Sequence, residues 1–120
     1  MTEELTTSTL LTAYANGYFP MAEHQDDDTL YWFSPDPRGI LPLEDFHIPH
    51  GLAKTLKKHP FTLRVNTDFE GTMRGCAEIV AKRKETWING RILDLYIELH
   101  RMGHAHSVEA WREDKLVGGL

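Results

Sequence analysis

Residues 103–120 read Gly103-His104-Ala105-His106-Ser107-Val108-Glu109-Ala110-Trp111-Arg112-Glu113-Asp114-Lys115-Leu116-Val117-Gly118-Gly119-Leu120. Along 106–111 successive side chains alternate between two faces, which is the period of a β-strand. The polar residues 112–115 then give a turn signal, and 116–117 opens a second apolar run. The stretch therefore predicts a β-hairpin, and such a hairpin needs further strands beside it to form a stable sheet.

The second strand of this hairpin is still apolar at Leu120, the last residue given. An edge strand at the end of a chain is the simplest explanation. However, no polar tail and no capping element follows the strand. We therefore expect this chain to be the front part of a longer protein.

Three other segments stand out by their aromatic residues: Tyr14-Ala15-Asn16-Gly17-Tyr18-Phe19-Pro20-Met21, Trp32-Phe33-Ser34-Pro35-Asp36-Pro37-Arg38 and Thr86-Trp87-Ile88. Together with 103–120 they resemble, in the same order, the motifs of the bacterial leucyl/phenylalanyl-tRNA–protein transferase family. Four ordered motifs cover nearly the whole chain, which makes the resemblance specific. Because members of that family are nearly twice as long, it also implies that their C-terminal part is absent here.

The composition is that of a globular protein in a reducing compartment. The 120 residues are 41% hydrophobic, enough for one domain or for a small lobe and an incomplete larger one. No run approaches the roughly 18 apolar residues of a transmembrane helix, and the acidic start at Glu3-Glu4 is unlike a signal peptide. Cys76, the only cysteine, has no internal disulfide partner. We therefore expect a cytoplasmic protein without a membrane partner.

The charge is unevenly distributed along the chain. The net charge is −5, yet residues 1–49 hold nine acidic residues and one basic residue, whereas residues 50–91 hold nine basic and four acidic ones. A basic segment on an acidic body predicts a local anion-binding face. Lys54, Lys57 and Lys58 lie on one side of an expected helix, where nucleic-acid contact and an ordinary solvated face are both open explanations.

Helical and strand patterns alternate along the chain. Apolar spacing and capping residues predict helices at 6–15, 50–59, 69–84 and 91–102, and short strands at 30–33, 40–43 and 61–65. Asn16-Gly17, Pro60 and Gly103 end three of the helices. This order indicates an α+β fold in which helices flank a mostly antiparallel sheet.

The segment Ser34-Pro35-Asp36-Pro37-Arg38-Gly39 predicts a rigid loop, which the resemblance implies to lie at the join of two domains. Its two prolines fix the backbone around Asp36, so that Asp36 and Arg38 are held at a set distance, as an ion pair that braces the loop or as part of a join between domains. The resemblance implies a small N-terminal lobe over 1–33. It implies, over 34–120, an acyltransferase-like domain of the N-acetyltransferase type that is incomplete at its C-terminal side.

Several reactive side chains have simple structural explanations. Cys76 lies on the apolar stripe of the expected helix 69–84, which favours a core residue over a nucleophile. His100, His104 and His106 are close in sequence, but the expected helix ends between them and no cysteine or carboxylate completes a zinc site at the usual spacing. We expect no metal, and the sequence has no glycine-rich phosphate loop or nucleophile elbow.

Trp87 lies in a loop between two expected helices. A lone tryptophan there either packs on the core as a plug or forms a wall of a ligand pocket. The size and hydrophobicity of the side chain alone favour packing on the core. The resemblance implies the second role, because the matching tryptophan of the family lies near the aminoacyl-binding pocket. It likewise implies that Lys54, Lys57 and Lys58 contact the tRNA acceptor stem, although His50 stands where an arginine is common.

The reaction that the resemblance implies is aminoacyl transfer. Leucine, phenylalanine or methionine would pass from the 3′ end of aminoacyl-tRNA to the α-amino group of a protein that begins with Arg or Lys, marking it for N-degron degradation. This is aminolysis of an activated ester, so the protein positions two substrates, assists proton removal and stabilises an oxyanion, with no cofactor required. The expected partners are aminoacyl-tRNA and acceptor proteins, bound by a monomer.

The sequence leaves the catalytic residues unassigned. Asp36 and Glu109 are available carboxylates, but the resemblance implies that the general base and most of the pocket lie beyond residue 120. The rival function is therefore a non-catalytic tRNA- or protein-binding module, and we expect the isolated chain to be inactive and poorly stable. An acetyl-CoA-dependent enzyme is a weaker alternative, because the sequence lacks the Gln/Arg-x-x-Gly-x-Gly/Ala turn that binds pyrophosphate.

Overall fold

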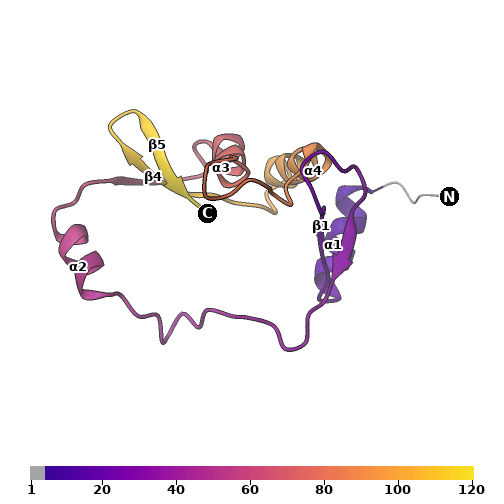
Figure 1. Cartoon of the computed structure of the whole chain (residues 1–120), viewed down its shortest axis with the longest axis horizontal. Helices are drawn as coiled ribbons and strands as arrows, with labels where there is room; N and C mark the ends of the chain where they lie inside the picture. The colour runs from indigo at the N-terminus through magenta and orange to yellow at the C-terminus, as the bar shows by residue number, and fades with distance from the viewer. Residues whose placement is uncertain (1–4) are drawn as a thin grey trace.

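The computed structural model of the chain describes residues 5–120, and its extents are 55 × 33 × 33 Å (Figure 1). The elements follow in the order α1 (Thr7–Ala15), β1 (Phe19–Met21), β2 (Tyr31–Phe33), α2 (His50–Lys57), β3 (Thr62–Val65), α3 (Phe69–Cys76), α4 (Gly90–Arg101), β4 (Val108–Arg112) and β5 (Lys115–Gly119). Within the described range, no helix has the length and apolar character needed to cross a membrane.

The strands form two antiparallel sheets. In the first, β1 pairs with β2. The second has the order β3-β4-β5, in which Val65 lies opposite Val108 and Glu109 opposite Gly119. The hairpin that 103–120 predicts is thus confirmed, and helices combined with antiparallel sheets make the fold α+β.

Local sequence signals set the ends of the helices. The Thr6 hydroxyl accepts a hydrogen bond at the start of α1, and Asn89 Oδ1 accepts the amide of Ile92 at 2.9 Å at the start of α4. After α1 and α4 the chain turns through Gly17 and Gly103, whose φ angles of 85° and 86° favour glycine. These are the termination signals that the sequence predicts.

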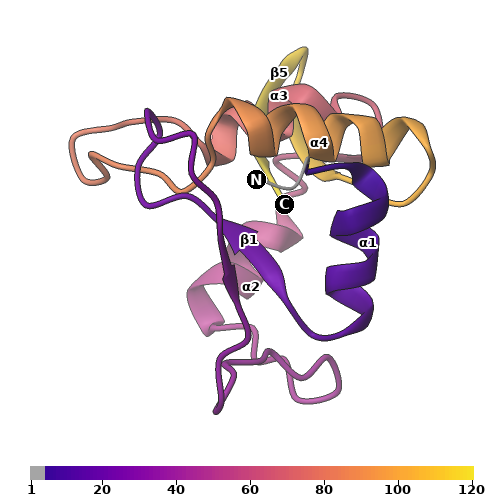
Figure 2. The ribbon, with the colours of Figure 1, turned by 90° about the vertical axis from the view of Figure 1, so that its right-hand side faces the viewer.

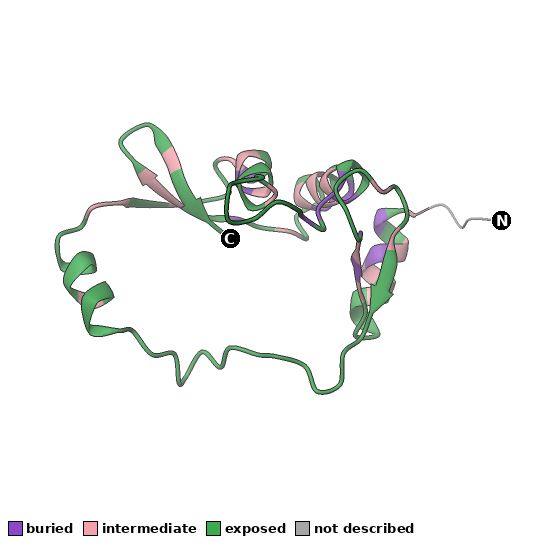
Figure 3. Ribbon diagram, in the orientation of Figure 1, coloured by how far each residue is buried: buried purple, intermediate pink, exposed green. Residues whose placement is uncertain are grey.

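The core of the molecule lies between α1 and α4. Leu10, Leu95 and Leu99 are buried and pack together. Figure 2 shows α1 beside α4, and Figure 3 shows buried residues on both helices. Because α3 also packs against α4 and β5, the N-terminal helix and the larger sheet are connected through α4.

An exposed arm separates the two sheets along the chain. Residues 34–49 are all exposed, and Figure 1 shows this segment and α2 extending away from the helices α3 and α4. The prediction of a strand at 40–43 is wrong, since this segment has no regular structure and Ile40 is 79% exposed. No strand of the described chain lies beside it to exchange hydrogen bonds, and Pro42 has no amide proton to donate.

Arg38 connects the start of this arm to the first sheet. Its guanidinium lies 4.9 Å from the centre of the Phe19 ring, at cation–π distance. The sequence left open an ion pair between Asp36 and Arg38. Within residues 5–120 this ion pair is not formed. The basic side chain therefore braces the loop through an aromatic ring instead of a carboxylate.

α3 is shorter than the sequence pattern predicts. It ends at Cys76 and does not continue to 84, because residues 77–83 fold into a turn in which the Arg83 guanidinium donates to the Glu78 carbonyl oxygen at 2.6 Å. Cys76 consequently lies at the end of the helix and is exposed. The expectation that Cys76 is a core residue is wrong for the same reason.

Candidate functional site: an apolar cavity beside the hairpin

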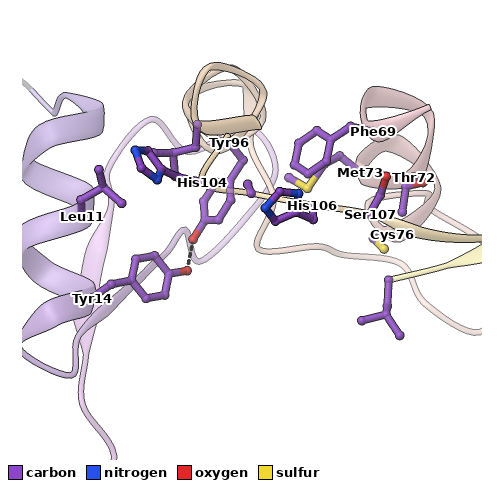
Figure 4. A pocket seen from close by; sticks show the side chains of 13 residues that line it. Leu11, Tyr14, Phe69, Thr72, Met73, Cys76, Tyr96, His104, His106 and Ser107 are labelled. Carbon is purple, nitrogen blue, oxygen red and sulfur yellow. Dashed lines mark hydrogen bonds between the residues drawn. The ribbon is translucent and has the colours of Figure 1, made fainter. Parts of the chain in front are cut away.

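A cavity of about 430 Å³ opens between α1, α3, α4 and the segment that precedes β4 (Figure 4). Its volume is in the range of small-molecule sites. Apolar side chains make most of its walls, namely Leu11, Phe69, Met73, Leu99, Ala105 and Leu120. The remaining lining residues are Tyr14, Thr72, Cys76, Tyr96, His104, His106 and Ser107.

Two tyrosines from different helices meet at this cavity. The hydroxyls of Tyr14 on α1 and Tyr96 on α4 are hydrogen-bonded, and the rings are edge to face with centroids 6.5 Å apart (Figure 4). Burial, reinforced by the bond with Tyr14, raises the pKa of Tyr96 far above its usual range. The Tyr96 hydroxyl therefore keeps its proton. Because the bond between the two hydroxyls uses one of the two protons, the other remains available to a ligand.

Asn66 holds the segment that leads into β4. Its backbone amide donates to the Ser107 carbonyl oxygen at 3.0 Å, and its side-chain Oδ1 accepts the backbone amide of Ser107 at 2.9 Å. Its Nδ2 lies 3.0 Å from His106 Nδ1. The φ angle of Asn66 is 59°, a left-handed conformation that asparagine tolerates better than most residues. The short turn after β3 thus fixes two residues of the cavity wall.

His100 supports the same segment from α4. Its ring stacks on Phe69 of α3 with centroids 4.3 Å apart and an interplanar angle of 4°. Its Nδ1 lies 2.8 Å from the Ala105 carbonyl oxygen, at hydrogen-bond distance. The 104–107 segment is therefore held between α4 and the turn at Asn66, which makes one wall of the cavity rigid.

Glu109, next to this wall, is completely buried and fully hydrogen-bonded. Its carboxylate accepts the Ser107 hydroxyl at 2.6 Å, the Asp68 amide at 2.9 Å, the Trp111 indole at 3.0 Å, and both the amide and the hydroxyl of Thr67. Burial by itself would raise the pKa of Glu109, but these hydrogen bonds outweigh it and lower the pKa to about 2. A carboxylate held in this way is a structural anchor and does not accept a substrate proton near neutral pH.

The cavity is suited to an apolar group that carries a hydrogen-bond acceptor. Its walls bury hydrocarbon, and its tyrosine pair offers a neutral donor. Among residues 5–120, no group of three His, Cys, Asp or Glu side chains is arranged to hold a metal ion. An acyl group with an apolar side chain has the required combination of surfaces.

Comparison with known proteins assigns the chain to a family. The family model described as leucyl/phenylalanyl-tRNA protein transferase matches residues 40–120, and the model of the N-terminal domain of that transferase matches residues 3–36. The chain belongs to this family. The resemblance that its four motifs carry is thereby confirmed.

Curated relatives agree with the family models. A leucyl/phenylalanyl-tRNA–protein transferase of Paramagnetospirillum magneticum is 53% identical over 116 residues, which are 97% of this chain and 56% of the relative. A protein of the same name from Nitrobacter winogradskyi is 53% identical over 117 residues, which are 98% of this chain and 52% of the relative. The chain spans about half the length of the curated relatives it matches.

The residues that the transferase resemblance singles out lie in two places, both outside the cavity wall. Trp87 precedes α4, is 40% exposed, and its carbonyl oxygen accepts the Ala22 amide at 3.2 Å. Lys54 and Lys57 on α2, and Lys58 at its end, are exposed. Figure 1 shows α2 and α1 at opposite ends of the long axis, so the lysines lie far from the tyrosine pair.

Sequence reasoning missed the role of Asn66 and the pairing of the two tyrosines. In the sequence, Asn66 is one of the polar residues between the expected strand 61–65 and the expected helix 69–84, and Tyr14 begins one of the four family motifs. An asparagine directly after a strand is a signal for a left-handed residue and could have identified the turn. No local signal pairs Tyr14 with Tyr96, since 82 residues separate them.

Proposed function

We propose that this protein transfers leucine, phenylalanine or methionine from aminoacyl-tRNA to the α-amino group of proteins that begin with Arg or Lys, marking them for N-degron degradation in the cytoplasm. The observation that supports this proposal most strongly is the 53% identity, along 97% of the chain, to a protein named leucyl/phenylalanyl-tRNA–protein transferase. The reaction converts an ester into a more stable amide, so it needs neither an energy source nor a metal.

In this proposal the aminoacyl side chain occupies the cavity of Figure 4. The apolar wall formed by Leu11, Met73 and Leu99 suits an unbranched-at-Cβ hydrocarbon or phenyl group, and a volume of about 430 Å³ leaves room for the adjoining ester. The tyrosine pair supplies a donor for a polar atom next to that side chain. The protein accelerates the reaction by positioning and by hydrogen bonding to developing charge.

We also propose the substrate contacts that the family resemblance implies. Lys54, Lys57 and Lys58 bind phosphates of the acceptor stem, which fits their exposure on one short helix. Trp87 contacts the aminoacyl end. Because Trp87 does not line the cavity, a direct contact between Trp87 and the aminoacyl side chain would place that side chain outside the cavity, and variants at Trp87 and in the cavity test this alternative.

The proposed architecture has two parts. Residues 1–33 form a small N-terminal lobe, and residues 34–120 belong to an acyltransferase-like domain of the N-acetyltransferase type. Two observations support the division: the two sheets share no strand, and the exposed segment 34–49 separates them. A monomer binding aminoacyl-tRNA and an acceptor protein is the proposed working form.

A non-catalytic binding module remains the second candidate, because Glu109 is a structural anchor and Asp36 lies in the exposed arm. The two candidates are separated by a transfer assay on residues 1–120 joined to the C-terminal remainder of the Paramagnetospirillum magneticum relative. Labelled phenylalanine should pass from charged tRNA to an Arg-initiated acceptor and not to the same acceptor with an acetylated N-terminus. Binding of charged tRNA without transfer would support the binding module.

A further inference from the structure

The hydrogen bonds around Asn66 determine the protonation pattern of a ring in the cavity wall. The backbone amide of Ser107 can only donate, so the branch of the Asn66 side chain that faces it at 2.9 Å is the acceptor Oδ1. The other branch is therefore Nδ2, a donor, and it lies 3.0 Å from His106 Nδ1. Nδ1 must then be the acceptor of this bond.

An imidazole that accepts at Nδ1 is the neutral tautomer with its proton on Nε2. His106 lines the cavity, and Figure 4 shows its ring among the side chains of that wall. Nδ1 is occupied by Asn66, and no group in residues 5–120 accepts a hydrogen bond from Nε2. The unused polar atom of His106 is thus an N–H donor.

The surroundings keep this donor in place. Asn66 makes three hydrogen bonds to the 106–107 segment, one through its backbone amide and two through its side chain. The next residues, Thr67 and Asp68, are fixed by the buried Glu109 carboxylate. A ligand that accepts the Nε2 proton therefore binds a side chain that is already ordered, and the protein loses little conformational entropy on binding.

We propose that His106 is a specificity-determining binding residue whose Nε2–H donates to the acyl carbonyl oxygen of the ligand, and that Asn66 is the positioning residue that selects this tautomer. The identity of the ligand, an aminoacyl ester, rests on the proposed function. A carbonyl oxygen accepts hydrogen bonds and never donates them, so the opposite tautomer would place a lone pair against a lone pair. His106 in this state does not act as a general base at Nε2, which already holds a proton.

The tautomer is tested first, without ligand, in the protein in which residues 1–120 are joined to the C-terminal remainder of the Paramagnetospirillum magneticum relative. Long-range ¹H–¹⁵N correlation spectra at pH 8, above the usual imidazole pKa of about 6.5, distinguish a protonated ring nitrogen from an unprotonated one. We expect the proton on Nε2 of His106. In Asn66→Asp, which also tolerates the left-handed backbone, the donor becomes an acceptor, so Nδ1 should become protonated. A proton on Nδ1 in the unaltered protein would overturn the proposal.

The donor is tested by binding of a non-hydrolysable phenylalanyl-adenosine amide, measured by calorimetry. In His106→Asn the shorter amide keeps an acceptor near the Nδ1 position for Asn66 but loses the Nε2 donor, and affinity should fall about tenfold. In His106→Gln the longer amide places an N–H near the Nε2 position, and affinity should stay within about threefold of the unaltered protein. His47→Asn and His47→Gln, in the exposed arm, are the matched controls.

The outcomes separate this inference from the proposed function. Equal affinity of His106→Asn and the unaltered protein would overturn the donor role while leaving the aminoacyl site intact. If the unaltered protein does not bind the amide, the assignment of the cavity to an aminoacyl ester is wrong. In that case the tautomer spectra still decide whether Asn66 fixes the ring.

Discussion

Glu109 joins three parts of the chain through one carboxylate. It lies on β4, it accepts hydrogen bonds from Thr67 and Asp68 where β3 leads into α3, and it accepts the Ser107 hydroxyl beside the cavity. The residue opposite Glu109 on β5 is Gly119. The buried carboxylate of Glu109 therefore holds together the elements around the site.

Replacing this carboxylate should destabilise the protein. In Glu109→Gln one oxygen becomes an amide group that faces donors, and each buried donor left without an acceptor costs about 1–3 kcal/mol. We expect a loss of about 2–4 kcal/mol in the free energy of unfolding, measured by urea denaturation. Glu98→Gln, on the exposed face of α4, is the control and should change stability little. A Glu109→Gln variant as stable as the control would show that the hydrogen bonds are weak.

The depressed pKa of Glu109 predicts an acid-sensitive fold. The folded-state pKa is about 2, below the ordinary glutamate value, so the ionised carboxylate stabilises the folded state. This contribution is fully present above a pH of about 4.5 and is lost as the pH falls toward about 2. Urea midpoints measured from pH 7 to pH 2 should therefore fall in this window, and the slope should be smaller in Glu109→Gln. Parallel curves for the two proteins would contradict the assignment.

Trp87 offers a test of binding against packing. Because its side chain is 40% exposed, Trp87→Ala should cost less stability than the roughly 3–5 kcal/mol of a fully buried tryptophan. If Trp87 contacts the aminoacyl end, the KM for phenylalanyl-tRNA should rise about five- to tenfold in the joined protein, as expected for an aromatic contact of about 1 kcal/mol or slightly more. A variant with a strongly reduced free energy of unfolding and an unchanged KM would identify Trp87 as a residue that packs on the core.

At the scale of elements, α2 carries Lys54 and Lys57, Lys58 follows directly, and among residues 5–120 the helix makes no extensive contact with another helix or strand. Replacing Lys54, Lys57 and Lys58 together by Ala should weaken tRNA binding. It should also reduce the slope of log K against log salt by about 2–3, because each phosphate contact contributes about 0.7–0.9. Filter binding at several salt concentrations measures both effects.

The matched control for α2 replaces three other exposed lysines, Lys82, Lys84 and Lys115, by Ala. This control variant changes the net charge by the same amount, but outside α2. An equal loss of slope in both triple variants would mean that charge alone matters, and an unchanged slope in the α2 variant would exclude this helix from the tRNA surface.

Elements with local signals could be predicted, and those that depend on distant partners could not. The hairpin β4–β5 has its alternation and its turn within one stretch, and α4 has both its cap and its final glycine. The segment 40–43 is apolar enough for a strand, but a strand also needs a neighbour. The helix beginning at Phe69 has apolar spacing beyond Cys76, yet a side-chain bond from Arg83 stabilises a turn there.

The cavity was beyond sequence reasoning for a related reason. Its walls come from α1, α3, α4 and the 104–107 segment. Tertiary packing brings them together, including that of Leu10 against Leu95 and Leu99 and that of α3 against α4. The motif containing His106 could be recognised from the sequence. The hydrogen bond that gives its ring a defined tautomer could not, because Asn66 lies 40 residues away.

At the scale of the whole molecule, one face of the larger sheet is apolar and exposed. Leu63 is 73% exposed, Val65 is 61% exposed, and Leu120, whose backbone pairs with Val108, is 83% exposed. Alternation along the strands places these side chains on one face. Such a face is an association hazard in a free protein.

We therefore expect residues 1–120 alone to be poorly stable, to associate as concentration rises, and to show no transfer of phenylalanine to an Arg-initiated acceptor. Light scattering and the transfer assay measure these properties. The chain joined to the remainder of the Paramagnetospirillum magneticum relative should be monomeric and active. Activity of the isolated chain within about tenfold of the joined protein would show that a general base lies within residues 1–120, with Asp36 and His104 to be tested first.

The tyrosine pair spans two parts of the molecule, because Tyr14 belongs to α1 and Tyr96 to α4. A ligand that contacts both hydroxyls binds the docked arrangement of these helices better than an undocked one. Occupancy of the site and docking of the first helix are then thermodynamically coupled, and the coupling is reciprocal. A substitution on α1 that abolishes docking, far from any ligand atom, would lower affinity by the same factor by which the ligand strengthens docking, and a milder substitution would lower it by less.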